Sequence, residues 1–446
     1  MPAKKSQSIG EDVMEAAAKA LDATLDAAQT FNPLLVALKN NDKKNLFKTN
    51  VTTAFIKTGY PLYDYFFGAV INTHDELGRL IGQEPRIGQA IGTFNLLIGS
   101  SGSGKTTFGA QVGANIIRQF KYANLIHFDC EQRFDVSRAE TITQLPSVFF
   151  DESKGERYMI KSGAVGLDII QEMIVKMYVQ KMKLKDQLIV PSGFKDEFGK
   201  DVMMLQPTVI LIDSITTVLN ETFNPDSAKE ASDAEGLRTN TEGARDAKTL
   251  KGFFKDVLPL CKEGNIIIYG INHINSNMSM NAFIPVAKQQ NYLKQDESIP
   301  GGKTMIYYPY NIIKLTAKPS DDFTVDSDGF AGHMVMVEPI KSSSNQSGNN
   351  SKGISFELVF SHKEGFLNLQ SLVMYGRDHG LIEGNKARLK FKDDPNCSFV
   401  WKNLDKEVKE KPIWENIKKY IIPSLNEHLP FIEPSEHEFD MRSLDY

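Results

Sequence analysis

Mainly apolar segments recur at regular intervals through the middle of this chain. Four of them lie at 94–98, 124–131, 208–214 and 266–272, and the last three end in polar residues. Continuous aliphatic runs of this length are typical of strands that are buried on both faces, as in a parallel sheet. We therefore predict four neighbouring strands at these positions.

Amphipathic stretches with helical spacing lie between these runs. Apolar residues recur every three or four positions after residue 105 (Phe108, Val112 and Ile116), within 165–183 and within 241–262. Strands that alternate with helices predict an α/β fold, with a mainly parallel twisted sheet flanked by helices. Ligands are then expected at the carboxyl ends of the strands.

The two ends of the chain depart from this central pattern. Residues 12–30 are rich in alanine and predict a helix that packs on a neighbour or a partner subunit. Strand-like alternation returns at 354–375, and 376–430 predict a small helical module before an acidic tail. The predicted divisions are an N-terminal helical oligomerisation segment with a linker (1–50), a core (51–375) and a C-terminal module (376–446).

The segment that follows the first run matches the nucleotide-binding pattern G-x-x-x-x-G-K-[ST]. Its glycines allow the backbone to wrap around a polyphosphate, and the following helix directs its N-terminus at the anion. Lys105 places a positive charge near the β- and γ-phosphates, and the Thr106 hydroxyl can ligate Mg²⁺. We therefore expect ATP or GTP to bind with Mg²⁺. The residues expected to hold the nucleotide are Gly99, Ser100, Ser101, Gly102, Ser103, Gly104, Lys105, Thr106 and Thr107.

Three further strand ends carry residues suited to phosphoryl chemistry. Asp213 ends an aliphatic run and is expected to hold Mg²⁺ or its water. Glu131 can orient and deprotonate the water that attacks the γ-phosphate, although Asp129 lies on the same face of the strand and spacing alone does not separate the two. His273 can contact the γ-phosphate and report its loss to the segment that follows.

Composition sets the broad class of the protein. The chain has 446 residues, of which 41% are hydrophobic and 24% charged, and no run is long enough for a transmembrane helix. It begins without an apolar signal core, and its three cysteines are far apart, so we expect a cytoplasmic protein with reduced thiols. The net charge of −5 neither indicates nor excludes nucleic acid as a ligand.

The order of these motifs resembles that of the RecA-type recombinases, and most closely the tailed-phage UvsX-type branch. The likeness rests on the segments 99–106, 129–131, 212–214, 245–251 and 271–273, and on 394–401 near the C-terminus. Two long polar segments, at 220–240 and 274–303, follow the strands that carry Asp213 and His273. Loops of this length inside a compact domain are usually functional.

The resemblance implies an ATP-dependent recombinase that polymerises on single-stranded DNA and promotes pairing with duplex DNA and strand exchange. It implies that Glu131 is the catalytic carboxylate, that Asn272 and His273 form the sensor pair, and that 216–240 and 274–300 are the DNA-binding loops. It further implies adenine contacts from Asp135 and Arg138, a contact of Lys341 with a neighbouring subunit's ATP, and mediator or single-strand-binding proteins as partners. The DNA-contacting candidates are Met278, Met280, Phe283 and Ile284 as wedges between bases, with Lys288 and Lys294 near phosphates.

Two alternatives remain at this point. A hexameric helicase motor shares the fold and the phosphate-binding loop, but is expected to carry an arginine finger and a larger N-terminal domain. A non-catalytic filament or mediator protein would use ATP only as a clamp. The three hypotheses predict different behaviour. A recombinase forms a helical filament on DNA, a helicase motor forms a closed ring, and a clamp protein shows no nucleotide turnover.

Overall fold

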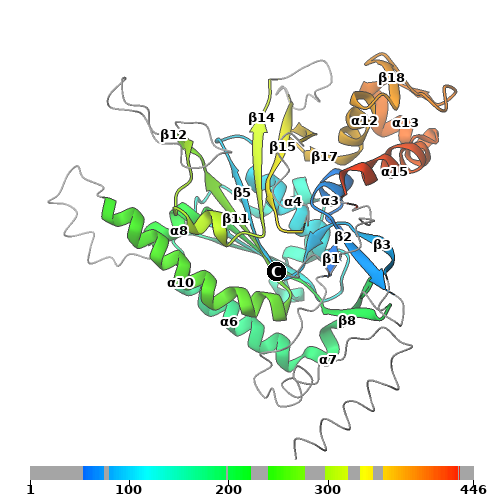
Figure 1. Cartoon of the computed structure of the whole chain (residues 1–446). Coiled ribbons are helices and arrows are strands. Elements are labelled where there is room, and N and C mark those ends of the chain that lie inside the picture. The colour runs from blue at the N-terminus through cyan, green and yellow to red at the C-terminus, as the bar shows by residue number, and fades with distance from the viewer. Residues whose placement is uncertain are drawn as a thin grey trace, which may run out of the picture. The chain divides into compact units, whose positions relative to one another are not determined.

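The computed structural model of the chain describes residues 54–74, 80–196, 199–221, 240–276, 297–319, 332–344, 355–429 and 431 (Figure 1). The chain divides into two compact units. The first unit comprises 1–54, 71–84 and 191–202. Most of its described residues lie in two two-stranded sheets, whose strands extend a few residues into the ranges of the second unit: β2 (Ala69–His74) with β3 (Leu80–Arg86), and β8 (Ile189–Lys195) with β9 (Asp201–Leu205). The second unit comprises the remaining residues and contains every site described below.

A nine-stranded sheet forms the centre of the second unit, in the order β17-β16-β15-β14-β5-β11-β10-β6-β7. The predicted strands are confirmed as β5 (Phe94–Gly99), β6 (Asn124–Asp129), β10 (Thr208–Asp213) and β11 (Ile266–His273). They run parallel to one another and to β7 (Tyr158–Ser162) and β14 (Asn311–Ala317). At one edge β15 (His333–Ser342), β16 (Phe356–Ser361) and β17 (Gly365–Leu367) are antiparallel. The predicted α/β fold with a mostly parallel sheet is therefore confirmed.

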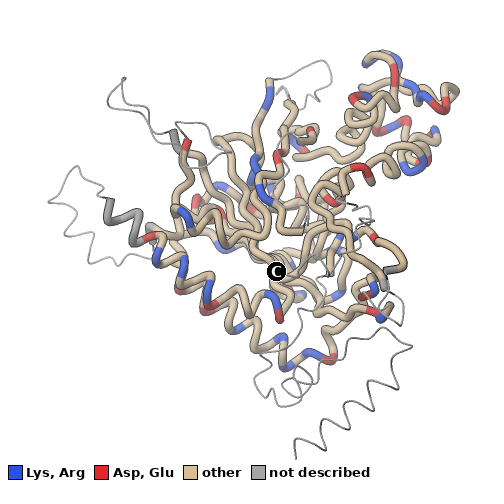
Figure 2. Tube along the Cα trace, viewed as in Figure 1, with Lys and Arg blue, Asp and Glu red and all other residues tan. Residues whose placement is uncertain are grey.

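One face of this sheet is covered by α6 (Leu167–Lys183), α8 (Ile215–Glu221) and α10 (Asn240–Gly264) (Figure 1). Alternate strand residues such as Ile210 and Ile212 face these helices, and Phe254 of α10 stacks against Phe94 with ring centroids 4.4 Å apart. Figure 2 shows lysines and acids along α10, and those at 251, 255, 256, 262 and 263 are exposed. The helices predicted at 165–183 and 241–262 are confirmed as α6 and α10. Their apolar stripes pack on the apolar face of the sheet.

The other face of the sheet packs against α4 (Lys105–Ile117). The helix lies close to the strands because it presents a glycine to them: a Cβ at Gly109 would come within 2.7 Å of the Leu211 side chain. Phe108 is fully buried on α4 and contacts the rings of Tyr60 and Tyr63 from the α3 region (α3, Pro61–Phe66). This packing fixes the start of α4 against the carboxyl end of β5.

Short elements complete the unit. They are β1 (Phe55–Ile56) paired with β4 (Gln89–Ala90), α5 (Val136–Thr143), α7 (Lys185–Leu188), α11 (Thr304–Tyr307), and β12 (Asn275–Ser276) paired with β13 (Glu297–Ser298). Among the described residues, no helix combines the length and the apolar character needed to cross a membrane.

Two predictions about the C-terminal part were wrong. The strand-like pattern predicted for 354–375 ends early, because α12 (Asn368–Asp378) begins three residues after the Gly365 turn. The module after 376 is not only helical. It has a three-stranded antiparallel sheet of β18 (Ile382–Asn385), β19 (Arg388–Phe391) and β20 (Ser398–Phe399) before α13 (Leu404–Glu410), α14 (Ile413–Asn416) and α15 (Ile422–Ser424). These strands have two to four residues, which is too short for alternation to identify them.

Candidate nucleotide-binding site

The turn between β5 and α4 is built on glycines at positions that other residues do not fit. A Cβ at Gly99 would lie 2.3 Å from the Leu315 carbonyl oxygen on β14. Gly104 is the N-cap of α4 with φ +83°, and a Cβ there would lie 2.8 Å from the Phe366 ring. The turn can therefore form only with glycine at these two positions, and it ends at the positive end of a 13-residue helix.

Lys105, the first residue of α4, folds back over this turn. Its Nζ donates hydrogen bonds to the carbonyl oxygens of Gly99 (3.0 Å) and Ser100 (2.7 Å). Burial lowers the pKa of Lys105 to about 8, although the carboxylates of Asp213 and Glu131 act in the opposite direction. The amine is therefore a strongly desolvated cation whose charge is available for an anion in the same pocket.

Thr106 and Asp213 meet directly across the sheet edge. The Thr106 hydroxyl donates to Asp213 Oδ2 at 2.5 Å. Burial raises the pKa of Asp213 to about 6, the Thr106 hydrogen bond lowers it, and the nearby carboxylates of Glu131 and Asp129 raise it further. A hydroxyl and a carboxylate in contact are the oxygen ligands that Mg²⁺ prefers, and a divalent cation would relieve the repulsion among the acids. The peptide bond from Asp213 to Ser214 is cis.

Glu131 and His273 form a hydrogen-bonded pair at the carboxyl ends of β6 and β11. His273 Nε2 lies 3.0 Å from Glu131 Oε1, and Arg133 lies 3.6 Å from the other carboxylate oxygen. Burial raises the pKa of Glu131, but the hydrogen bond and charge of His273, together with Arg133 and Ser214, outweigh it and hold the pKa below its usual value. The competing candidate Asp129 accepts a hydrogen bond from the Phe134 backbone N–H at 2.9 Å and is almost fully buried. Glu131 is thus the more accessible carboxylate of the two.

Asn272 connects the residues that flank the two long polar segments. Its side-chain oxygen accepts from the Thr216 hydroxyl at 2.8 Å, and its amide donates to the Pro300 carbonyl at 2.9 Å. The same oxygen accepts from the backbone N–H of His273 at 3.0 Å. Just beyond, β12 and β13 pair Asn275 with Ser298, which holds the two ends of the second segment together. The buried Asn272 amide therefore links one residue beside each of the two segments, Thr216 and Pro300, to His273 and so to Glu131.

These side chains surround a pocket of about 500 Å³. Of the predicted site residues, the pocket is lined by Ser101, Gly102, Gly104, Lys105, Thr106, Thr107, Glu131, Asp135, Arg138, Asp213 and His273. The other predicted residues of the turn do not line the pocket: Gly99, Ser100 and Ser103. They belong to the turn itself, in which the Ser103 hydroxyl donates to the Ser100 carbonyl oxygen at 2.9 Å. Among the predicted residues alone, the pocket brings together positions up to 172 apart in the sequence, from Ser101 to His273.

Further parts of the pocket lining come from the start of α5 and from the end of β16 with the turn that follows it. Asp135 caps α5 by accepting from the Arg138 backbone N–H at 2.7 Å. The Arg138 guanidinium donates to the carbonyl oxygens of His362 (2.9 Å) and Lys363 (3.0 Å). Asp135 and Arg138 therefore both line the pocket, their contact with adenine stays a prediction, and Arg138 also binds the turn that carries His362.

Several pocket residues were not anticipated from the sequence: Arg133, Phe134, Ile271, Phe360 and His362. Arg133 and Phe134 directly follow the Asp-Cys-Glu segment, so proximity to Glu131 was an available signal. Phe360 and His362 come from the antiparallel strand β16 and the turn that follows it, and no local pattern connects them with a loop more than 250 residues earlier.

The remaining predicted ligand contacts are Lys341 and six residues that the structure does not describe. Met278, Met280, Phe283, Ile284, Lys288 and Lys294 lie outside the described residues, as do most of 216–240, the predicted helix at 12–30 and the acidic tail. Lys341 does not line the pocket; its Nζ donates to the carbonyl oxygens of Ile306, Tyr307 and Pro309 at 2.6–3.2 Å. Its predicted contact with a neighbouring subunit's nucleotide stays a prediction.

The residues present fit a nucleoside triphosphate with Mg²⁺. The glycine turn at a helix N-terminus suits phosphate oxygens, Lys105 supplies charge, and the Thr106–Asp213 pair supplies oxygen ligands. Comparison with known proteins adds no family assignment: no protein-family model matches the chain, and no curated protein is detectably similar to it in sequence.

Proposed function

We propose that this protein is a RecA-type, ATP-dependent DNA recombinase that assembles on single-stranded DNA and promotes homologous pairing and strand exchange. Its enzymatic activity would be ATP hydrolysis stimulated by DNA. The proposal rests on the arrangement of the residues in the pocket together with the order of the motifs along the chain.

One observation carries the proposal: the Glu131–His273 pair adjoins the Asn272 amide that links Thr216 and Pro300. A nucleotide pocket that only stores ATP has no need of a connection from its carboxylate to two segments at the same sheet edge. A DNA-stimulated ATPase needs such a connection. The state of the γ-phosphate must change the DNA-binding segments, and DNA on those segments must change the site of hydrolysis.

The chain's own residues divide the work as follows. Lys105 would place its charge on the β- and γ-phosphates, and Thr106 with Asp213 would hold Mg²⁺, which neutralises charge on the phosphates when bound. Glu131, kept ionised by its lowered pKa, would accept a proton from the attacking water. His273 would orient Glu131 through the Nε2 contact and move with the backbone that leads into residues 274–300.

The test combines turnover with imaging of the full-length protein. ATP hydrolysis is measured with and without single-stranded DNA, and electron microscopy examines the protein with ATP and DNA. We expect DNA-stimulated hydrolysis, helical filaments on DNA, and exchange of a labelled strand between homologous molecules. Lys105→Ala is the matched control, since it removes the charge on the transferring phosphoryl group and should abolish turnover in a folded protein.

Other outcomes would support the competing hypotheses. Closed rings that unwind duplex DNA would indicate a helicase motor. DNA-bound filaments without nucleotide turnover would indicate a structural clamp. Hydrolysis that is indifferent to DNA would remove the basis for the proposed coupling through Asn272.

A further inference from the structure

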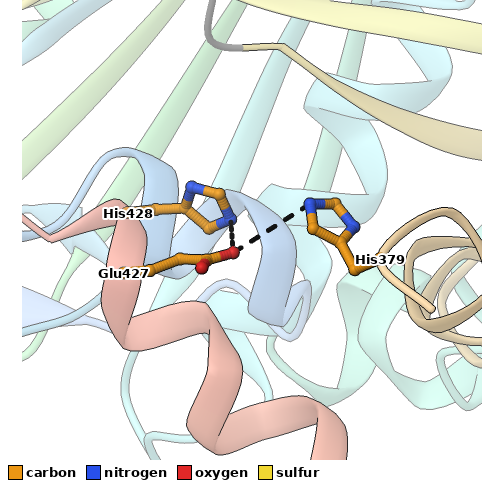
Figure 3. A group of neighbouring side chains, drawn as sticks. All are labelled: His379, Glu427 and His428. Carbon is orange, nitrogen blue, oxygen red and sulfur yellow. Dashed lines mark ion pairs between the residues drawn. The ribbon is translucent and has the colours of Figure 1, made fainter. Parts of the chain in front are cut away.

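A second cluster of metal-binding side chains lies at the C-terminal end of α12, away from the residues that line the nucleotide pocket. Among the described residues, His379, Glu427 and His428 bring one ligand atom each within 4.8 Å of the others. Figure 3 shows a Glu427 carboxylate oxygen between the two imidazole rings. We propose that these three residues form a binding site for a divalent transition-metal ion of the Zn²⁺ type. The proposal is independent of the proposed recombinase function.

The hydrogen bonding of His379 prepares its Nε2 atom to bind a cation. Its Nδ1 lies 2.9 Å from the backbone carbonyl oxygen of Tyr375, which can only accept, so Nδ1 carries the proton. In the neutral ring the lone pair is then on Nε2, which faces Glu427 Oε1 at 4.0 Å. Imidazole ligands of metals usually donate their other N–H to a carbonyl or carboxylate in this way. The lone pair of Nε2 and the carboxylate of Glu427 repel each other. A cation that lies between the two atoms turns this repulsion into two attractive contacts.

His428 supplies a fixed ligand on the other side of the carboxylate. Its Nε2 lies 3.4 Å from Glu427 Oε1, and its ring stacks on Phe66 of α3 with centroids 4.0 Å apart. The Tyr375 hydroxyl lies 2.7 Å from the same nitrogen and 3.0 Å from Glu427 Oε1. With a metal on Nε2 of the ring, the hydroxyl donates its single proton to the carboxylate. Tyr375 thus acts as a positioning residue for Glu427.

The distances suit a tetrahedral ion after small side-chain rotations. Metal–ligand bonds of about 2.0–2.2 Å place tetrahedral ligands about 3.4 Å apart, which matches the Glu427–His428 separation of 3.4 Å. The Glu427–His379 separation of 4.0 Å needs a shorter approach, and both side chains can rotate because they are 56% and 41% exposed. The site also lies at the negative end of the 11-residue helix α12, where a cation is favoured.

Two imidazoles and one carboxylate are a zinc ligand set that leaves a fourth position for water. Imidazole ligands also suit Ni²⁺, Cu²⁺ and Co²⁺, whereas Mg²⁺ and Ca²⁺ prefer oxygen ligands. A bound ion would fasten residues 427–428 to the end of α12 and, through the ring of Phe66, to α3. Its expected effect is therefore a higher thermal stability of the folded chain.

The experiment titrates Co²⁺ into the chelator-treated, nucleotide-free, full-length protein and follows its visible absorption, with competition by Zn²⁺. We expect one Co²⁺ per chain with a four-coordinate spectrum, displacement by Zn²⁺, and a rise in the thermal unfolding midpoint when Zn²⁺ is added. His379→Ala and Glu427→Gln should each weaken binding by at least about tenfold. Both positions are exposed, so both variants should remain folded. His273→Ala is the control, since it removes the other His–Glu pair and should leave the spectrum unchanged.

The proposal would be overturned if the wild type binds no Co²⁺, or if neither His379→Ala nor Glu427→Gln weakens binding. Loss of the spectrum in His273→Ala alone would assign the metal to the nucleotide pocket and would equally overturn it. If Zn²⁺ leaves the unfolding midpoint unchanged and the variants lower it without metal, the cluster is a hydrogen-bonded contact only.

Discussion

His273 Nε2 and Glu131 Oε1 are 3.0 Å apart, although His273 ends β11 and Glu131 follows β6, and these two strands are separated in the sheet by β10. The sequence indicates a separate role for each residue, one as the base and one as the sensor. Their contact makes the two roles a single unit, because a movement of the histidine changes both the orientation and the pKa of the carboxylate.

Replacement of the carboxylate should separate binding from hydrolysis. Glu131→Gln keeps the shape but loses the base, so we expect ATP to bind normally, to be hydrolysed slowly, and to give longer-lived DNA complexes. Single-turnover hydrolysis and DNA dissociation rates measure these effects. Asp129→Asn is the comparison: a wild-type rate in Glu131→Gln together with a slow Asp129→Asn would show that the other carboxylate is the base.

Removal of the histidine should shift the pH dependence of hydrolysis. His273 holds the pKa of Glu131 down, so in His273→Ala burial is opposed by fewer groups and the pKa rises. A carboxylate base is active above its pKa, so the acidic limb of the kcat profile should move to higher pH. In the same variant, ATP should still bind, but the ATP-dependent gain in DNA affinity should become smaller. An unchanged acidic limb would show that the pair does not act in the reaction.

Nucleotide affinity should fall at alkaline pH because of Lys105. Its pKa is lowered to about 8 and the phosphates require the charged amine, so above pH 8 binding must take up a proton. We expect the Kd for ATP to rise by up to about tenfold per pH unit above that value. Lys105→Arg is the matched variant: its guanidinium stays charged, so its affinity, although altered by the different geometry, should not vary over this range. Parallel profiles of the two proteins would contradict the assignment.

Contacts with DNA should divide into apolar and charged contributions. If Met278, Met280, Phe283 or Ile284 enters between bases, truncation of that residue to alanine should cost about 1–3 kcal/mol of DNA binding, at low and high salt alike. Lys288→Ala or Lys294→Ala should instead flatten the salt dependence of binding. Fluorescence titrations with single-stranded DNA at several salt concentrations measure both effects. Wild-type binding in all four apolar variants would exclude this segment as the source of wedges.

Stability should depend on pH through Asp64, a buried carboxyl that lies in α3. Thr58 donates to it from its backbone N–H (2.9 Å) and its hydroxyl (2.7 Å), yet burial raises the pKa to about 7. The pKa of Asp64 is higher in the folded than in the unfolded state. Its contribution to the free energy of unfolding is therefore largest in acid and is lost as the pH rises through 7. Between pH 5 and 8 the wild type should therefore lose about 2–3 kcal/mol relative to Asp64→Asn, measured by urea unfolding. The exposed control Asp186→Asn should show no such trend, and parallel pH curves for Asp64→Asn and the wild type would contradict the prediction.

The sequence by itself determined four parallel strands of the sheet and the glycine turn between β5 and α4. The runs at β5, β6, β10 and β11 are apolar throughout because both faces of those strands are covered, and this pattern depends on no distant residue. The turn could be read because Gly99, Gly104, Lys105 and Thr106 act within one local segment, and local backbone geometry restricts which residues fit there. Asp213 and Glu131 could be placed because parallel strands bring their carboxyl ends to one edge.

The tertiary structure alone decided which of these groups touch. The Phe134 N–H binds Asp129 within one local segment, whereas His273 reaches Glu131 only after β6 and β11 join the same sheet. The contribution of Phe360 and His362 to the pocket depends on an antiparallel edge whose position no local spacing specifies. The approach of His379 to Glu427 and His428 likewise depends on how the last described segment packs on α12 and α3. Hydrophobic periodicity encodes which face of an element is buried, whereas side-chain contacts between distant segments are set by the packing of the whole chain.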